Sequence, residues 1–185
     1  VYHDPSLSRL SNSTAFIEKI SLDSIKKIEL IGGLSIPTLN EVIDIIPEKI
    51  FLNIELKGEN TAYETNKIII KYLSESNLTS SKFIISSFRW DELKKFRNVN
   101  KDVPIAILVD SLYKIDNAIK LAKEINAFAL NPNNKFITQE IVKKIQSNNI
   151  KVYPYTINTP KNIKRMKSIG VDAIITDYPE RINNN

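Results

Sequence analysis

Two charged side chains of opposite sign stand two residues apart at the end of an apolar run. Residues 50–57 alternate as a strand does, so Glu55 and Lys57 point to one face while Ile54 and Leu56 point to the other. Gly58 then ends the strand. A carboxylate can hold a hard cation and a neighbouring ammonium can hold a phosphate, although an ordinary ion pair at a strand end gives the same pattern.

The chain has one histidine, His3, and no cysteine. An imidazole can give or take a proton near neutral pH, so His3 is a candidate general acid. A mechanism with two histidines and a zinc site built from histidines are excluded within this chain. Disulfides and thiolate metal sites are excluded as well.

Composition indicates a globular protein, and its net positive charge is compatible with a small anionic substrate. The 185 residues suit one domain, and the net charge of +5 comes from lysines scattered along helical stretches. Because aromatic residues do not alternate with these cations, we expect no nucleic-acid binding. No apolar run reaches about 18 residues, so we expect no transmembrane segment. The sequence does not distinguish a cytoplasmic location from one on the extracytoplasmic side of a membrane-anchored parent protein.

The first fifty residues predict short elements. Ser21 caps a predicted helix that runs through Leu30 and ends at Gly32-Gly33. Thr38 and Glu41, three residues apart, predict a capping box at the start of a second helix.

From residue 50 onward short apolar strands alternate with helices of about three turns, which is typical of a parallel β/α protein. Polar residues recur just after the strands and would share one rim. A closed barrel and an open doubly wound sheet both remain possible on this pattern, although no glycine-rich phosphate loop follows a strand. The six predicted strands cover residues 50–56, 83–87, 105–109, 127–130, 151–157 and 173–175.

Six short stretches resemble the glycerophosphodiester phosphodiesterase family, in the family's order and spacing. They are Tyr2-His3-Asp4, Ile36-Pro37-Thr38-Leu39, Asn53-Ile54-Glu55-Leu56-Lys57, Ile85-Ser86-Ser87-Phe88, Tyr155-Thr156-Ile157-Asn158 and Ile175-Thr176-Asp177-Tyr178-Pro179. The resemblance runs the length of the chain and implies one domain, residues 1–185. The implied fold is a TIM-type (β/α)8 barrel that is N-terminally truncated, with about six of eight β/α units present.

The resemblance also implies roles for single residues. His3 matches a catalytic histidine that protonates the leaving alcohol, and Glu55 matches a ligand of a divalent cation, Ca²⁺ or Mg²⁺. Lys57 matches a phosphate-binding lysine. Phe88 and Tyr155 are expected to line the substrate cleft, with Tyr155 where the family often has Trp. Arg9 and Asp177 also match the family, and we interpret both as structural.

The implied reaction is hydrolysis of a glycerophosphodiester, a small-molecule substrate, to an alcohol and glycerol 3-phosphate. The family's His-Arg-Gly motif and two further acidic ligands are not in this sequence. We therefore expect the 185 residues alone to be nearly inactive, to bind the cation weakly or not at all, and to self-associate through open strand edges.

Two alternatives remain. One is a non-catalytic truncated barrel used for binding or assembly. The other is a different β/α-barrel phosphohydrolase with a similar Glu-x-Lys strand, against which the matches at residues 86–88 and 176–179 argue.

Overall fold

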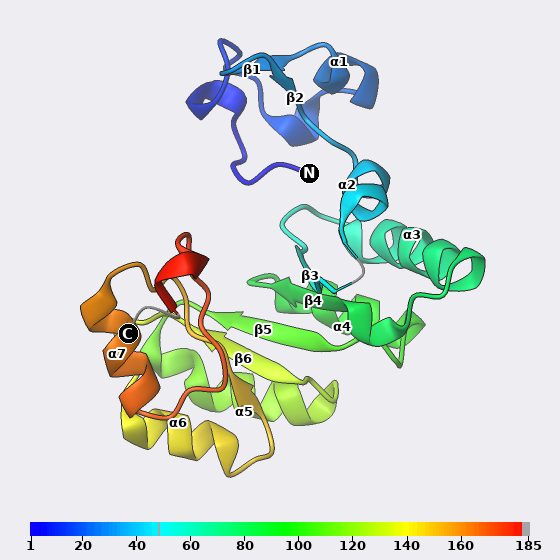
Figure 1. The fold of residues 1–185 in the computed structure, drawn as a ribbon. Coiled ribbons are helices and arrows are strands. Elements are labelled where there is room, and N and C mark those ends of the chain that lie inside the picture. Colours follow the sequence, from blue (N-terminus) through cyan, green and yellow to red (C-terminus); the bar gives the residue numbers. More distant parts are fainter. Residues whose placement is uncertain (48, 183–185) are drawn as a thin grey trace. The chain divides into compact units, whose positions relative to one another are not determined.

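The computed structural model describes residues 1–47 and 49–182. The chain divides into two compact units, Val1–Leu52 and Asn53–Asn185, and each is described by itself. Figure 1 shows the elements of both.

The first unit consists of short elements joined by turns. They are η1 (Leu7–Arg9), η2 (Ile17–Lys19), α1 (Leu22–Lys26), β1 (Glu29–Leu30), β2 (Leu34–Ser35) and α2 (Leu39–Ile45). Leu7 is fully buried and is the main apolar anchor of the N-terminal loop. The unit therefore depends on local turns and caps more than on a large core.

The predicted helix from Ser21 through Leu30 is too long. Ser21 caps α1 as expected, since its side chain accepts a hydrogen bond from the Ser24 N–H, but α1 ends at Lys26. Leu30 lies in β1, which pairs antiparallel with β2. Gly32 and Gly33 have φ of +88° and +74° and form the turn between these strands, not a helix end. A positive φ suits either role, so the glycines alone could not distinguish them.

The capping box of the second predicted helix is confirmed. The Thr38 hydroxyl accepts from the Glu41 N–H at 3.2 Å, and the Glu41 carboxylate accepts from the Thr38 N–H at 2.7 Å. Lys26 donates to the same carboxylate at 2.9 Å. Glu41 thereby links α1 to α2 within the first unit.

The second unit is built on a five-stranded sheet in the order β3-β4-β5-β6-β7. Its strands from β4 to β7 pair in parallel, each with the next along the chain. Sequential parallel order is typical of a β/α barrel and not of a doubly wound sheet, in which the order reverses. The strands are β3 (Leu52–Glu55), β4 (Phe83–Ser87), β5 (Ile105–Val109), β6 (Ala129–Pro132) and β7 (Lys151–Val152).

Helices connect the strands and cover the sheet. α4 contacts β4 and β5, α5 contacts β5 and β6, and α6 contacts β7. The side chains of Thr138 and Thr159 cap α6 and α7, with Pro160 in the first turn of α7. The connecting elements are α3 (Thr61–Glu75), η3 (Ser80–Lys82), α4 (Trp90–Val99), η4 (Leu112–Lys114), α5 (Ile115–Glu124), α6 (Gln139–Gln146) and α7 (Pro160–Ser168), followed by η5 (Pro179–Ile182).

The sixth predicted strand, residues 173–175, is wrong as a strand, and β7 is shorter than predicted. Residues 173–175 do run beside β7 and the segment that follows it, because the Ala173 N–H donates to the Val152 carbonyl at 3.4 Å and the Ile175 N–H donates to the Pro154 carbonyl at 3.0 Å. Pro154 has no N–H to donate towards residues 173–175, whereas Tyr153 and Tyr155 still donate to Leu130 and Pro132 on the side of β6. Within the described residues the sheet is therefore open, with β3 and β7 as its outermost strands.

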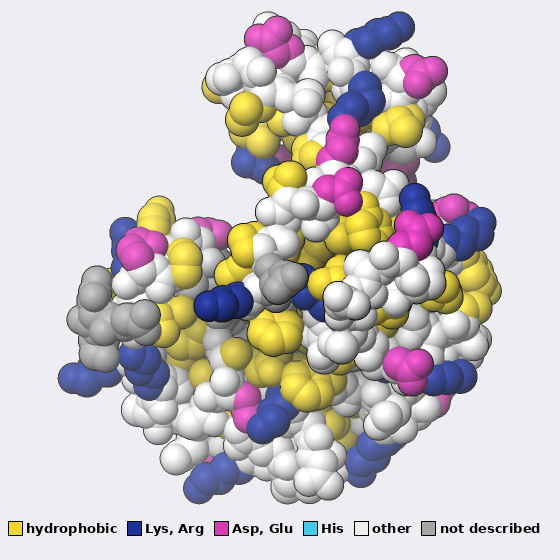
Figure 2. All heavy atoms as spheres, turned by 45° about the vertical axis from the view of Figure 1, so that its right-hand side comes forward, with side chains coloured by type: hydrophobic (Ala, Val, Ile, Leu, Met, Phe, Trp, Pro, Cys, Tyr) yellow, Lys and Arg dark blue, Asp and Glu magenta, His cyan; other side chains and the backbone are white. Residues whose placement is uncertain are grey.

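Charged side chains are dispersed over the face shown in Figure 2, where Lys and Arg lie among acidic and apolar residues without forming a stripe. The absence of nucleic-acid binding and the self-association stay predictions. None of the helices in the described part of the chain is long and apolar enough to cross a bilayer.

Candidate functional site at the carboxyl ends of the strands

Glu55 and Lys57 lie together at the end of β3, as the alternation predicted. Glu55 Oε1 and Lys57 Nζ are 3.6 Å apart, and their side chains are 26% and 36% exposed. Leu56 between them is buried at 2% exposure, which anchors the strand end from its other face. A carboxylate and an ammonium are thus presented side by side with solvent access.

Hydrogen bonds from β4 hold this strand end in place. The Leu56 N–H donates to the Ser86 carbonyl at 2.8 Å, and the Ser87 hydroxyl donates to the Leu56 carbonyl. The Ser87 hydroxyl accepts in turn from the Arg89 N–H at 2.8 Å. The Ser-Ser pair that the sequence singled out therefore ties the end of β3 to the end of β4.

Phe88 and Tyr155, predicted from distant parts of the sequence, are in contact. Their ring centroids lie 5.7 Å apart in an edge-to-face arrangement. The Tyr155 hydroxyl donates to the Val109 carbonyl at 3.2 Å. Burial first, and then the nearby Asp110 carboxylate, raise the pKa of Tyr155 to about 12. Tyr155 is therefore an uncharged phenol at neutral pH and offers a surface for contact, not a base.

His3 belongs to the first unit and is described within it. Its Nδ1 lies 2.6 Å from Asp4 Oδ1, and Arg9 Nε donates to Asp4 Oδ2. The side chain of His3 is 71% exposed, so a substrate can reach it. Sequence reasoning treated Asp4 only as part of a motif and missed it as the partner of His3.

Asp177, expected to be structural, accepts a hydrogen bond from the Asn158 side chain at 2.7 Å. Asn158 also accepts from the Asp177 N–H at 3.0 Å. These two bonds close the turn after residue 175.

The predicted divalent-cation site can be compared with the ligand side chains that the described residues offer. Residues 1–47 and 49–182 contain no group of three or more His, Cys, Asp or Glu side chains placed to hold a metal ion. Glu55 can give one or two oxygens, whereas Ca²⁺ takes six to eight and Mg²⁺ six. The described residues alone do not fit a complete cation site.

A buried glutamate, Glu92, holds the loop after Lys57 in place. This residue was not identified from the sequence. Glu92, on α4, has no exposed surface. Its carboxylate accepts from the backbone N–H of Asn60 at 3.1 Å and of Ala62 at 2.9 Å. Asn60 precedes α3 with φ of +57° and makes no side-chain cap of its own. Glu92 therefore caps α3 from a neighbouring helix, where a negative charge is also favoured by the helix dipole.

Replacing Glu92 by Gln is expected to lower the free energy of unfolding by about 1–3 kcal/mol at pH 7, because a buried charged acceptor of backbone N–H groups is lost. Burial works to raise the pKa of Glu92, but hydrogen bonds from Lys95, Ala62 and Asn60 together hold it below its usual value. A lowered carboxyl pKa gives stability that is present above the unfolded-state pKa and lost as pH falls through the folded-state value.

The difference between wild type and Glu92→Gln should therefore shrink below about pH 4. Urea unfolding followed by the fluorescence of Trp90, the single tryptophan, measures it. Asp91→Asn is the matched control, because the neighbouring Asp91 side chain is 58% exposed. A difference that persists unchanged at pH 3 would contradict the assigned role.

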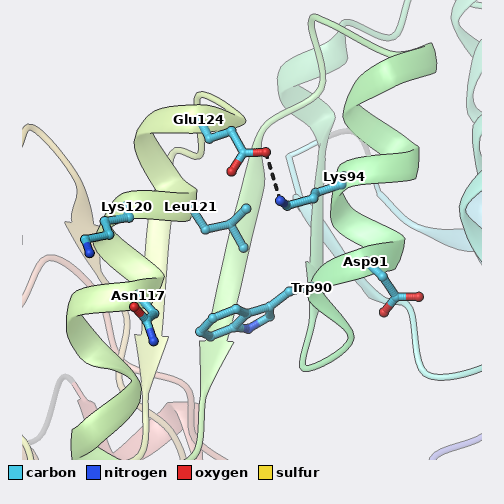
Figure 3. A pocket seen from close by; sticks show the side chains of 7 residues that line it. All are labelled: Trp90, Asp91, Lys94, Asn117, Lys120, Leu121 and Glu124. Atoms are coloured by element: carbon cyan, nitrogen blue, oxygen red, sulfur yellow. Dashed lines mark ion pairs between the residues drawn. The ribbon is translucent and has the colours of Figure 1, made fainter.

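The hollow drawn in Figure 3 is separate from these strand-end residues. It lies between α4 and α5 and is lined by Trp90, Leu121 and the ion pair of Lys94 with Glu124 at 2.8 Å, among others. The Trp90 indole N–H donates to the Leu108 carbonyl at 3.1 Å, which is a structural contact. None of the five residues predicted for the site lines this groove.

Comparison with known proteins shows which protein family this chain belongs to. The model of the Glycerophosphoryl diester phosphodiesterase family matches residues 1–181. A glycerophosphodiester phosphodiesterase of Caldanaerobacter subterraneus is 32% identical over all of this chain and 78% of its own length. One from Bacillus altitudinis is 28% identical over 98% of this chain and 78% of its own length.

Solved structures agree on the fold. A phosphodiesterase from Oleispira antarctica, in complex with the product sn-glycerol-3-phosphate, superposes with a TM-score of 0.87 at 24% identity, over 99% of this chain and 77% of that one. A putative glycerophosphoryl diester phosphodiesterase from Silicibacter pomeroyi gives 0.82 at 20% identity, over 100% and 77%. The predicted β/α-barrel fold class is confirmed, and the chain belongs to the glycerophosphoryl diester phosphodiesterase family.

Proposed function

We propose that this chain serves hydrolysis of glycerophosphodiesters to an alcohol and sn-glycerol 3-phosphate. The observation that carries the proposal is the Glu55–Lys57 pair, 3.6 Å apart and solvent-accessible at the end of β3. The carboxyl ends of barrel strands are where enzymes of this fold place their reacting groups. The family membership of residues 1–181 supports the same reaction class.

Each predicted residue has a role in this proposal. Lys57 offsets the negative charge of the phosphodiester, which otherwise repels an incoming oxygen. His3 gives a proton to the leaving alkoxide, a strong base that departs poorly without one. Phe88 and Tyr155, 5.7 Å apart, form an uncharged wall against which the substrate lies.

Glu55 is proposed as one ligand of a divalent cation, Ca²⁺ or Mg²⁺. When bound, such a cation would stabilise the charge that develops on the phosphoryl oxygens. Because the described residues form no group of three acidic or histidine ligands, we propose that the 185 residues alone bind the cation weakly and hydrolyse the substrate slowly or not at all.

The test compares two polypeptides. One is the 185-residue chain, and the other is a fusion of it to the part of the Caldanaerobacter relative outside the matched 78%. Release of sn-glycerol 3-phosphate from glycerophosphocholine is measured with Ca²⁺, with Mg²⁺ and with a chelator. We expect cation-dependent release by the fusion, abolished by His3→Ala and by Glu55→Ala.

Two results would count against the proposal. If a well-folded fusion shows no release with either cation, a non-catalytic binding role is favoured instead. If the 185 residues alone hydrolyse the substrate at the rate of the fusion, the predicted need for further cation ligands is wrong.

A further inference from the structure

Three side chains in the N-terminal loop, those of Arg9, Asp4 and His3, are linked one to the next by hydrogen bonds, with Asp4 in the middle. Asp4 uses one carboxylate oxygen for each neighbour. Its Oδ1 lies 2.6 Å from His3 Nδ1, and its Oδ2 accepts from Arg9 Nε. The side chain of Asp4 is only 23% exposed, whereas those of His3 and Arg9 are 71% and 57% exposed. Asp4 is thus the sheltered centre of the group.

The backbone around the group is fixed independently of these side chains. Leu7, between Asp4 and Arg9, is fully buried, and its N–H donates to the Ala15 carbonyl at 3.0 Å. The Ile17 N–H donates to the Pro5 carbonyl at 2.9 Å. The turn from Asp4 to Arg9 is therefore held at Pro5 and Leu7, and the side chain of Arg9 reaches back to Asp4.

The charge of Asp4 decides where the proton between it and His3 resides. Hydrogen bonds from Arg9, and next from His3, lower the pKa of Asp4 to about 2. At neutral pH Asp4 is a carboxylate, which can only accept hydrogen bonds. The short contact therefore requires that His3 Nδ1 carries a hydrogen and donates it.

We propose that Asp4 is a positioning residue that keeps the hydrogen of His3 on Nδ1, with Arg9 holding Asp4 in place, so that Nε2 is the ring nitrogen that exchanges a proton with the substrate. This inference rests on the proposed function, in which His3 acts as general acid.

The proton balance of the step follows. The oxygen of an incoming water forms the new bond to phosphorus, and the water loses a proton to the solvent. The bond from phosphorus to the leaving oxygen breaks, and that oxygen takes the bonding pair and the proton of His3 Nε2. The ring is left neutral, with its remaining hydrogen on Nδ1 facing Asp4. Without Asp4 a neutral imidazole can carry its hydrogen on either nitrogen, and the ring can rotate.

The experiment uses the fact that the chain has a single histidine. A long-range ¹H–¹⁵N spectrum of the ¹⁵N-labelled 185-residue chain contains one imidazole, and its two nitrogen shifts report which nitrogen carries the hydrogen. At about pH 9, where an ordinary imidazole is neutral, we expect the Nδ1–H form in the wild type. Asp4→Ala should move the ring to a mixture in which Nε2–H dominates.

Asp23→Ala is the matched control, since Asp23 lies in the first turn of α1 and should leave the nitrogen shifts unchanged. An Nε2–H form in the wild type, or an Nδ1–H form that survives Asp4→Ala, would overturn the proposal whether or not the protein hydrolyses a phosphodiester.

Kinetics of the active fusion provide the second readout. We expect Asp4→Ala to lower kcat about 10–100-fold with little change in KM, because the general acid is still present but no longer held in one form. An unchanged kcat in a fusion that His3→Ala inactivates would reject the positioning role while leaving the proposed function intact. Hydrolysis that survives His3→Ala would reject the role of His3 itself.

Discussion

Replacing Glu55 by Gln is expected to lower kcat/KM for glycerophosphodiester hydrolysis by about 10²–10³-fold, equivalent to about 2.7–4 kcal/mol of transition-state stabilisation. The substitution keeps the size of the side chain and removes its negative charge. It therefore removes both the proposed cation ligand and the partner of Lys57, whose Nζ lies 3.6 Å away. Hydrolysis by the fusion with the Caldanaerobacter segment is the measurement.

The cation dependence separates these two losses. If Glu55 binds the cation, raising the Ca²⁺ or Mg²⁺ concentration should recover part of the activity of Glu55→Gln, whereas a loss due only to the disturbed ion pair should not respond. Glu59→Gln is the control, since Glu59 follows on the same loop, is 72% exposed and pairs with Arg89 at 3.4 Å. We expect the kcat/KM of Glu59→Gln to stay within about twofold of the wild-type value, because an exposed ion pair contributes little. A kcat/KM of Glu55→Gln within about threefold of the wild-type value would contradict the proposed role of Glu55.

Elements whose signals are local could be predicted from the sequence. Thr38 with Glu41, and Thr159 with Pro160, are caps that act on the next turn of the same helix, and the structure contains both. The hairpin of β1 and β2 could not be predicted, because the pairing of Leu30 with Leu34 competes with a helical reading of the same apolar residues. Residues 173–175 are apolar, but Pro154, in the segment after β7 that they run beside, has no N–H to donate to them.

Some residues of the candidate site could likewise be predicted from local sequence patterns, and others could not. Glu55 and Lys57 could be predicted to share a face because strand alternation is a property of the residues themselves. Asp4 was visible beside His3, but adjacency in sequence does not say that the two side chains turn toward each other. Glu92 gave no signal, since it is 30 residues from Ala62 and its acidic side chain predicts an exposed position on α4.

A buried guanidinium in the second unit should have the largest effect on stability. Arg97, near the end of α4, is 8% exposed. Its Nε donates to the Ile125 carbonyl at 2.8 Å, and its Nη1 donates to Asn100 at 2.9 Å. Its Nη2 donates to Val103 at 3.1 Å. Arg97 therefore joins the end of α4, the loop that leads into β5 and the end of α5.

Two of these bonds reach the carbonyls of Asn100 and Ile125, which cap α4 and α5 at their carboxyl ends, where a helix leaves carbonyls without partners. Burial lowers the pKa of Arg97, and the Asp102 carboxylate opposes this, but a guanidinium stays protonated in proteins. All three of these acceptors are backbone oxygens, so a substitution leaves buried acceptors that no neighbouring side chain replaces. Each such acceptor costs about 1–3 kcal/mol when water cannot reach it.

Arg97→Leu is therefore expected to lower the free energy of unfolding by about 3–5 kcal/mol, a large part of the roughly 5–15 kcal/mol that a domain has. Urea unfolding followed by Trp90 fluorescence measures the change, since Trp90 lies on the same helix. Lys94→Leu is the matched control, one turn away, where an exposed cation pairs with Glu124 at 2.8 Å. Its loss should stay below about 1 kcal/mol.

Arg97→Lys distinguishes charge from geometry. A lysine keeps the positive charge but has no planar fork to reach carbonyls on separate segments, so it should recover less than half of the lost stability. If Arg97→Lys is as stable as the wild type, the charge alone matters. If Arg97→Leu is no less stable than Lys94→Leu, the carbonyls find water instead, and Arg97 does not hold the loops that shape the end of α5.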